Sequence, residues 1–358
     1  RHGLEPIRTA DLTTRQEWEG EKLNVVLDRL SEGTRRSYGQ GWRWWALFCR
    51  RREVDPLRRV TDENRPKEEE LVLDFVVRLA KQEHKSSSTI RQYLGAVRNA
   101  HVALGLVEPF RAMTRVWSTL DGFKKRQGTK PRRRPATPGM LRWIRRSLRP
   151  ASSWHDAAVW AAVALGYLFL LRSREYVHHD GYGGGNVGLR GVDLKARKDG
   201  REVPSFAQAD EVVLTIRGSK TDQQNLGSTF NQFRSGGNEL CVVQALADYA
   251  SHAPERMYGA QACDPLLVLE DGSPVTRAHV QRALRQAAVA EGLNPEDMGT
   301  HSLRIGGASA LWAAYRDSAL VQRWGRWTTN TWQSYVWPAR ENARGVSTAM
   351  SEANLGLL

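Results

Sequence analysis

The spacing of apolar residues predicts that the first third of the chain folds as a group of amphipathic helices. Apolar side chains recur there every three or four residues, which places them along one face of a helix. In one of these segments the stripe consists of Ile90, Leu94, Val97 and His101. The predicted helices of this region are Thr14–Leu30, Thr34–Arg52, Glu68–His84, Ser88–Leu106 and Met113–Arg126.

The pattern changes in the remainder of the chain. An amphipathic segment at Pro138–Leu148 and an apolar one at Trp154–Leu171 both read as helices. From 181 to about 234 the sequence is rich in glycine, and Glu211–Ile216 alternates as a strand does. Helical spacing then returns in the later segments, beginning with Leu240–His252 and Arg277–Glu291. The chain is therefore predicted to be mostly α-helical with a small β-sheet.

The charge balance favours a polyanionic partner. The 358 residues include 53 Lys and Arg against 39 Asp and Glu, a formal net charge of +14. Basic side chains that neutralise phosphates release condensed counterions, which favours binding to nucleic acid. Basicity alone fits a merely soluble protein equally well. The hydrophobic content of 41% is enough for a core in each of two domains.

Cysteine usage and apolar run lengths exclude several classes of protein. Cys49, Cys241 and Cys263 are odd in number and lack C-x-x-C spacing, which argues against a disulfide framework and against a zinc site. The longest apolar run, Ala157 to Leu171, is too short to span a bilayer easily, and no signal peptide opens the chain. We expect a soluble intracellular protein without a metal site and without a membrane partner.

Five residues in the second half of the chain form a set with recognisable chemistry. They are Arg172, His301, Arg304, Trp327 and Tyr335, and the last four fall within 35 residues. Two guanidiniums can hold the negative charge that develops on a phosphate while a phenol attacks the phosphorus. Hydrogen-bond donors beside them add to this stabilisation. Such a set can open a phosphodiester.

The segment that carries four of these residues resembles the catalytic C-terminus of the tyrosine recombinase (phage integrase) family. The family pattern is H-x-x-R, then His or Trp, then a nucleophilic Tyr. His301-Ser-Leu-Arg304 matches the first part, and Trp327 and Tyr335 follow Arg304 by 23 and 31 residues. The resemblance implies that Arg304 binds the phosphate, that Trp327 donates a hydrogen bond, and that Tyr335 forms a 3′-phosphotyrosyl bond. His301 would either donate to a non-bridging oxygen or exchange protons near the tyrosine.

A second motif supplies the first arginine of the site. Leu-Leu-Arg172-Ser-Arg-Glu175 resembles the family's Leu-Arg-x-x-Glu box. This makes Arg172 the catalytic arginine and Glu175, predicted on the same helical face, its supporting residue. Arg174 is a competitor for the role of Arg172. The glycine-rich insert that follows is a departure from the family, and the His178-His179 pair beside it has no third metal ligand in view.

Two assignments have rivals elsewhere in the chain. Lys220 resembles the family's catalytic lysine on a β-turn, which protonates the leaving 5′-oxygen. Lys195 and Lys198 lie in the same region and stay alternatives. Tyr315 is the rival of Tyr335 as nucleophile, but it follows Arg304 by only 11 residues, within the same predicted helix.

The resemblance also implies a domain organisation. It predicts a two-domain C-shaped clamp, in which a helical core-binding domain is joined to an α/β tyrosine-recombinase catalytic domain. The boundaries expected are an N-terminal tail at 1–13, the DNA-binding domain at 14–126, a basic linker at 127–137, the catalytic domain at 138–341 and a docking tail at 342–358. Contacts to DNA are expected from Arg91, Arg98, Lys124, Lys125, Lys130, Arg132, Arg133 and Arg134. A solvated basic face or a plain linker fits the same residues.

The function implied by the family is site-specific DNA recombination or integration, as in mobile elements, without cofactor, metal or ATP. The expected partner is double-stranded DNA with an inverted-repeat site, bound by a homotetramer on two duplexes. The expected compartment is the nucleus in a eukaryote, and the cytoplasm or nucleoid in a bacterium. Two alternatives stay open. One is a type IB topoisomerase or hairpin-forming resolvase, and the other is a DNA-binding relative that no longer cuts.

Overall fold

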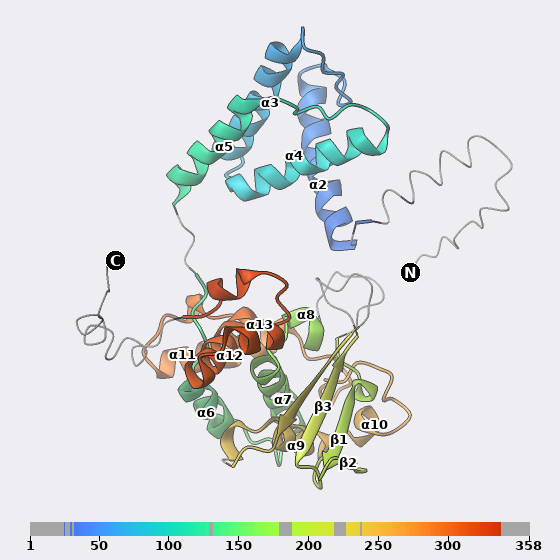
Figure 1. Ribbon diagram of the computed structural model, residues 1–358, viewed down its shortest axis with the longest axis vertical. Helices are drawn as coiled ribbons and strands as arrows, with labels where there is room; N and C mark the ends of the chain where they lie inside the picture. Colours follow the sequence, from blue (N-terminus) through green and yellow to red (C-terminus); the bar gives the residue numbers. More distant parts are fainter. Residues whose placement is uncertain are drawn as a thin grey trace, which may run out of the picture. The chain divides into compact units, whose positions relative to one another are not determined.

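The computed structural model describes residues 25, 29–30, 32–128, 132–178, 188–217, 227–236 and 238–337. The chain divides into two compact units, Arg1–Lys130 and Pro131–Leu358 (Figure 1). The division falls within the segment predicted as a basic linker. The predicted helix Thr14–Leu30 lies almost entirely outside the described residues, and the predicted docking tail at 342–358 lies wholly outside them.

The described part of the first unit is helical. The apolar stripe predicted from the sequence lies in its core, because the four residues that form it are fully buried. Around it pack large side chains such as Trp45 and Phe75, which meet edge to face with ring centroids 5.1 Å apart. The helices are α2 (Glu32–Arg51), α3 (Arg65–Lys81), α4 (Ser87–Ala103) and α5 (Thr114–Gln127).

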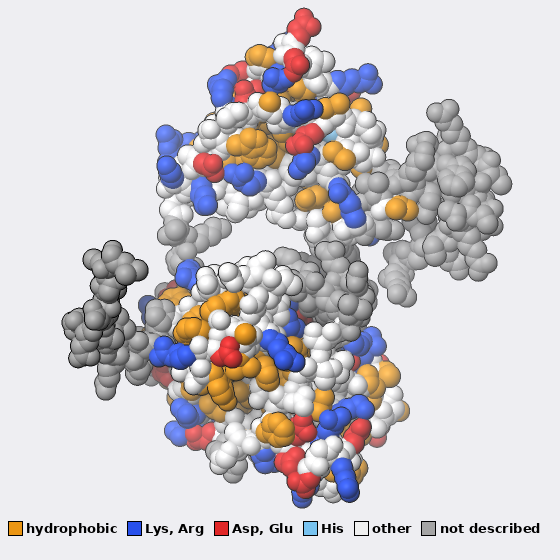
Figure 2. Space-filling model, in the orientation of Figure 1, with side chains coloured by type: hydrophobic (Ala, Val, Ile, Leu, Met, Phe, Trp, Pro, Cys, Tyr) orange, Lys and Arg blue, Asp and Glu red, His pale blue; other side chains and the backbone are white. Residues whose placement is uncertain are grey.

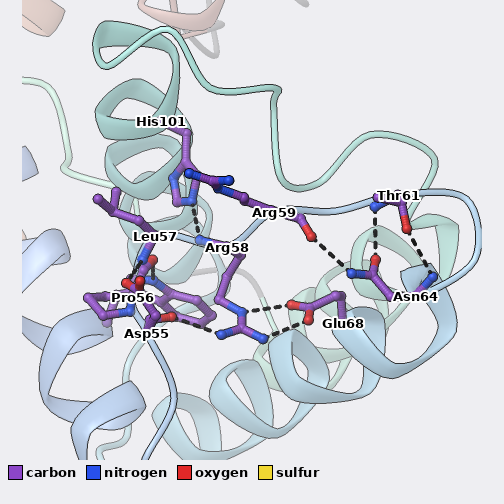
Figure 3. Close-up of polar contacts among 10 residues, drawn as sticks. Asp55, Pro56, Leu57, Arg58, Arg59, Thr61, Asn64, Glu68 and His101 are labelled. Atoms are coloured by element: carbon purple, nitrogen blue, oxygen red, sulfur yellow. Dashed lines mark hydrogen bonds and ion pairs between the residues drawn. The ribbon is translucent and has the colours of Figure 1, made fainter.

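A buried polar cluster fastens the loop after α2 to the neighbouring helices (Figure 3). The Arg58 guanidinium forms two hydrogen bonds to the Glu68 carboxylate at 2.6 and 2.8 Å. The backbone N–H of Arg58 donates to Nε2 of His101 at 2.8 Å. Since that nitrogen accepts, the ring proton lies on Nδ1 and is donated to the Val97 carbonyl, also at 2.8 Å. The buried histidine therefore links the loop to α4 and serves a structural role.

The second unit is built around α7 (Trp154–Leu168), whose residues from 157 to 167 are all buried. The apolar run seen in the sequence is thus a central helix of a globular core. No helix in the described ranges is long and apolar enough to cross a bilayer. The other helices of this unit are α6 (Pro138–Ser147), α8 (Ser173–Tyr176), α9 (Val242–His252), α10 (Pro254–Met257), α11 (Arg277–Ala290), α12 (Thr300–Tyr315) and α13 (Ser318–Trp324).

A small antiparallel sheet lies beside these helices (Figure 1). Its strand order is β2-β1-β3-β4, and Leu214 of the central strand pairs with Leu194 on one side and Phe230 on the other. All three side chains are buried. The strands are β1 (Leu194–Lys198), β2 (Arg201–Glu202), β3 (Glu211–Ile216) and β4 (Ser228–Phe233). The predicted fold class, mostly α with a small sheet, is confirmed.

Two glycines of α2 provide a test of the packing in the first unit. A Cβ added at Gly41 would lie 2.9 Å from the Cα of Tyr93 in α4, whereas one added at Gly39 would meet nothing within 4 Å. Gly39→Ala should therefore raise the free energy of unfolding by about 0.5–1 kcal/mol through helix propensity.

Gly41→Ala should instead lower the free energy of unfolding, because an overpacking cost of about 1–3 kcal/mol outweighs that gain. Calorimetry on the full chain, following the transition of the first unit, measures both changes. Stabilisation of similar size by the two substitutions would contradict the close crossing of α2 and α4.

Candidate active site

The first arginine of the site lies at the start of a short helix. The apolar helix α7 ends at Leu168, and Leu170 adopts a left-handed conformation with φ of 50°. Arg172 then precedes the first residue of α8 as its N-cap, with extended backbone angles. The sequence had placed Arg172 at the end of the long helix, with Glu175 on the same helical face. That expectation was wrong, because the turn at Leu170 ends the helix before the arginine is reached.

Arg172 and Glu175 nevertheless form a pair. The Arg172 backbone N–H donates to Oε2 of Glu175 at 2.7 Å, and its guanidinium donates to Oε1 at 3.0 Å. The Glu175 N–H donates in return to the Arg172 carbonyl at 2.7 Å. The Glu175 side chain thus satisfies the N–H of the residue that precedes the helix, as the glutamate of a capping box does. It fixes the orientation of the Arg172 side chain, which stays half-buried.

Helix α12 carries His301 and Arg304 and approaches its neighbours closely. A Cβ on Gly306 would lie 2.0 Å from the Ala136 carbonyl oxygen, and one on Gly307 would lie 2.2 Å from that of Tyr167. Only glycine therefore allows this contact between α12, the segment before α6, and α7. The close approach brings Arg304 beneath the turn at Leu170.

Arg304 is the most deeply buried charged residue of the site, with 1% of its surface exposed. Its guanidinium donates to two backbone carbonyls, those of Leu170 and Gly325. It also lies over the Trp327 ring, with 4.4 Å between the guanidinium carbon and the ring centroid. Burial, and then the positive charges of Arg172 and Arg326, lower the pKa of Arg304 to about 9. The side chain is therefore still cationic at neutral pH.

Tyr335 lies among these residues although it comes from a separate element. It follows the 3-10 segment Asn330–Ser334, and its ring centroid is 4.8 Å from that of Trp327 and 5.1 Å from that of His301. The Arg304 guanidinium is 5.6 Å from the tyrosine ring. Ser309 of α12 donates to the Tyr335 carbonyl and accepts from the N–H two residues later. The tyrosine ring is thus held beside the guanidinium of Arg304, the imidazole of His301 and the indole of Trp327.

His301 lies at the exposed rim of this cluster, in contrast to the buried Arg304 one turn along α12. Although the imidazole keeps access to solvent, its partial burial lowers the pKa below the ordinary value of 6.5. The positive charges of Arg304, Arg172 and Arg133 lower it further. The ring is therefore neutral at pH 7, and one of its nitrogens is able to accept a proton.

The Trp327 ring packs against the turn that directly precedes it, at Gly325. The residue is 8% exposed, and its backbone N–H donates to the Gln322 carbonyl at 3.0 Å. A Cβ at Gly325 would lie 1.6 Å from an atom of the Trp327 ring, so glycine is required there. The rival nucleophile Tyr315 is 67% exposed at the end of α12.

One residue of the cluster was missed by the sequence reasoning. Arg326 has a side chain that is only 6% exposed, and its Nη2 donates to Oε2 of Glu175 at 2.6 Å. It lies between Gly325 and Trp327 in a segment where several tryptophans dominate the pattern. A charged residue between a glycine and a buried tryptophan was the only signal available, and it does not reveal a partner 151 residues away.

The predicted catalytic lysine, Lys220, lies outside the described residues, in the connection between β3 and β4. Of its two alternatives, Lys195 is exposed and forms an ion pair with Glu202 at 3.1 Å. Lys198 is exposed at the end of β1. The assignment of the general acid stays a prediction.

The linker arginines that the structure describes contact the second unit. Arg132 donates to the Ser334 carbonyl, next to Tyr335, and lies over the ring of Trp337. Arg133 donates to two carbonyls, including that of Met298 at 3.2 Å. Arg134 pairs with Asp297 at 3.3 Å. All three arginines are exposed, so they are also accessible to a ligand.

The other predicted DNA contacts lie in the first unit, and one of them, Lys130, is outside the described residues. Arg91 pairs with Asp121, and Arg98 pairs with Glu108, each at 3.0 Å. Lys124 and Lys125 are exposed in the last turn of α5. Basic side chains are spread over the visible face of both units, with acidic ones among them (Figure 2). Binding of DNA by these residues stays a prediction.

No group of three or more potential metal ligands gathers anywhere in the part of the chain that is described. Of the two adjacent histidines considered as metal ligands, His178 pairs with Thr276 in an isolated β-bridge. His179 is outside the described residues.

Comparisons with known proteins identify the fold. No protein-family model and no curated protein matches the sequence. Among solved structures, the chain is similar to XerH site-specific recombinase bound to a palindromic difH substrate, with a TM-score of 0.54, 15% identity, and coverage of 79% of this chain and 70% of that one. It is also similar to a lambda integrase dimer bound to a COC′ core site, with a TM-score of 0.52, 15% identity, and coverage of 91% and 80%. Both are tyrosine recombinases, and the chain has their fold.

The environment of His301 gives a prediction about pH. The midpoint of its imidazole titration, measured by NMR and assigned by loss of the signal in His301→Gln, should lie below 6.5. Because the unfolded chain then binds a proton more readily than the folded one, the free energy of unfolding should rise with pH up to about 6.5 and then level off. His301→Gln should reduce that rise. A midpoint at or above 6.5 would contradict the site electrostatics.

Proposed function

We propose that the protein is a site-specific DNA recombinase that cleaves and rejoins DNA strands through a 3′-phosphotyrosine intermediate. The observation that carries the proposal is the convergence of His301, Arg304 and Trp327 on the ring of Tyr335. Arg172 comes from a different part of the chain and is linked to the site by Glu175, which also accepts from Arg326, and by the nearby Leu170 carbonyl, which accepts from Arg304. The tyrosine-recombinase fold supports the same conclusion.

The proposed reaction uses the groups of the chain itself. The Tyr335 hydroxyl oxygen attacks phosphorus, so that a tyrosyl–phosphorus bond forms while the bond to the 5′-oxygen breaks. The neutral His301 imidazole accepts the phenolic proton. Lys220 donates a proton to the departing 5′-oxygen, which leaves as a hydroxyl. One phosphoester replaces another, so the bond energy is kept and the 5′-hydroxyl of a second strand can reverse the step without ATP.

The arginines stabilise the charge that develops on the phosphate. In the transition state the non-bridging oxygens carry more negative charge than in the bound DNA. Arg304 is held in place by the Leu170 and Gly325 carbonyls, and Arg172 by Glu175, so neither guanidinium has to reorganise as that charge appears. Pre-positioned donors of this kind each contribute about 10²–10³-fold to the rate. Trp327 packs against the phenol and can donate a single hydrogen bond through its indole N–H.

The proposed partner is double-stranded DNA with an inverted-repeat site. The recombination and integration of a mobile element by a homotetramer on two duplexes fits this chemistry, and docking of the tail at 342–358 on a neighbouring subunit is part of the same proposal. The reaction would take place wherever the DNA is, in the nucleus of a eukaryote or in the cytoplasm or nucleoid of a bacterium. Efficient relaxation of a supercoiled plasmid that lacks a specific site would instead favour a topoisomerase.

Tyr335→Phe tests the nucleophile, because it removes only the attacking oxygen. We expect the variant to keep specific DNA binding and to lose the covalent protein–DNA adduct. The adduct is detected by mapping covalent junctions on a genomic DNA library, and binding is measured by gel shift on the duplex so identified. Tyr315→Phe is the matched control and should form the adduct as the unchanged chain does. An adduct in Tyr335→Phe, or its loss in Tyr315→Phe, refutes the assignment.

Lys220→Ala tests the general acid. On a normal phosphodiester we expect cleavage to slow by about 10²–10⁴-fold. On the same duplex with a 5′-bridging sulfur the rate should be largely restored, because a thiolate leaves without a proton. The measurement is single-turnover cleavage of both substrates, with Lys195→Ala and Lys198→Ala in parallel. Equal defects of Lys220→Ala on the two substrates would move the role to another residue.

A further inference from the structure

Two loops contact the buried guanidinium of Arg304, and each contains a residue other than glycine in the left-handed conformation. The first contains Leu170 with φ of 50°, and the second contains Arg326 with φ of 55°. Each loop supplies one carbonyl to Arg304, from Leu170 and from Gly325. Left-handed backbone is costly for residues other than glycine. The repeated use of it indicates that both loops are held in place by their contacts.

A second contact joins the same two loops. The Glu175 carboxylate accepts from Arg172 of the first loop through Oε1 and from Arg326 of the second loop through Oε2, at 3.0 and 2.6 Å. The side chain of Glu175 is 10% exposed and that of Arg326 is 6% exposed. Glu175 therefore bridges the catalytic arginine and an arginine that directly precedes Trp327.

The cluster holds more positive charge than its own carboxylate balances. The guanidiniums of Arg172, Arg304 and Arg326 and the carboxylate of Glu175 leave a net charge of +2. Among the described residues, Nε and Nη1 of Arg326 are buried and have no hydrogen-bond partner. Ion pairs that serve only stability do not gain from an uncompensated third cation, because like charges in a buried site repel each other. The excess is explained if an anion completes the site.

We infer that Arg326 is a third arginine of this site, a positioning residue that orients Arg172 through Glu175 and raises the site's charge to +2. The inference rests on the proposed function. A phosphodiester carries one negative charge, and the five-coordinate phosphorus formed by attack of a phenolate carries two. A site charge of +2 therefore interacts more strongly with the transition state than with bound DNA, and Arg326 contributes to the rate of cleavage more than to affinity.

The experiment removes the positive charge of Arg326 from the protein and, separately, the negative charge of the cleaved phosphate from the DNA. Arg326→Gln is compared with Arg323→Gln, which removes the same charge from an exposed residue of α13. The DNA is the duplex identified by the covalent junctions, with either a normal phosphate or an uncharged methylphosphonate at the cleaved position. Single-turnover formation of the tyrosyl adduct is measured for both substrates, together with affinity by gel shift.

For Arg326→Gln we expect adduct formation to slow by about 10²-fold on the phosphate, with affinity nearly unchanged. On the methylphosphonate isomer whose methyl group replaces the non-bridging oxygen next to Arg172, the slowing should be less than about threefold, because Arg172 has no oxygen to hold there. Arg326→Lys keeps the charge but loses the planar guanidinium, so it should slow adduct formation on the phosphate less than Arg326→Gln does. Arg323→Gln should leave the ratio of the two rates as it is. Equal slowing of Arg326→Gln on the two substrates would mean that the ion pair only supports the fold, and would overturn the inference.

A second comparison keeps the test valid if Arg326→Gln does not fold. In a Glu175→Gln background no carboxylate is left without its partner, and the link from Arg326 to Arg172 is absent. Glu175→Gln should therefore lower the ratio of phosphate to methylphosphonate rates by itself, and the further change Arg326→Gln should alter that ratio by less than about threefold. A ratio that Glu175→Gln leaves unchanged would overturn the inference. Absence of any adduct with the unchanged chain is a different result, because it would refute the proposed function itself.

Discussion

The site depends on one interaction, the binding of the buried Arg304 guanidinium to the carbonyls of Leu170 and Gly325. Burial of a guanidinium that is 1% exposed is costly unless its donors find acceptors within the fold. Nη1 and Nη2 of Arg304 find such acceptors, while Nε has none among the described residues. Those two carbonyls belong to the loops that precede Arg172 and Trp327. The contact that satisfies the buried charge therefore also sets the distance between the other residues of the site.

Close backbone approaches make that contact possible. Glycines at 306 and 307 let α12 lie directly against the backbone at Ala136 and Tyr167, and Gly325 leaves room for the Trp327 ring. The segment that carries Tyr335 is held against these elements by hydrogen bonds from Ser309 of α12 and Arg132 of the linker. Rigid elements hold the groups that we propose to bind phosphate, while the proposed nucleophile is carried by a short separate segment. This division suits a reaction in which the tyrosine must approach a phosphate that is already bound.

Many basic side chains of the described residues already have acidic partners within the chain. Arg91 and Arg98 in the first unit and Arg134 in the second are examples. Exposed ion pairs of this kind contribute about 0–1 kcal/mol each, so exchanging a carboxylate for a DNA phosphate costs little. The net charge of +14 still favours DNA after such an exchange, because the displaced carboxylates are fewer than the basic residues.

The sequence by itself determined the elements whose signals are local. The sequence predicted the buried stripe of α4, the apolar helix α7 and the placement of Arg304 and Tyr315 in one helix, α12. Spacing along the chain is enough to predict each of them. Only the tertiary structure showed that Arg172 caps a new helix, since the left-handed turn at Leu170 is stabilised by packing and carries no sequence signature. It also revealed Arg326, whose partner Glu175 is 151 residues away. Contacts over such separations are decided by how whole helices pack, and periodicity along the chain does not encode them.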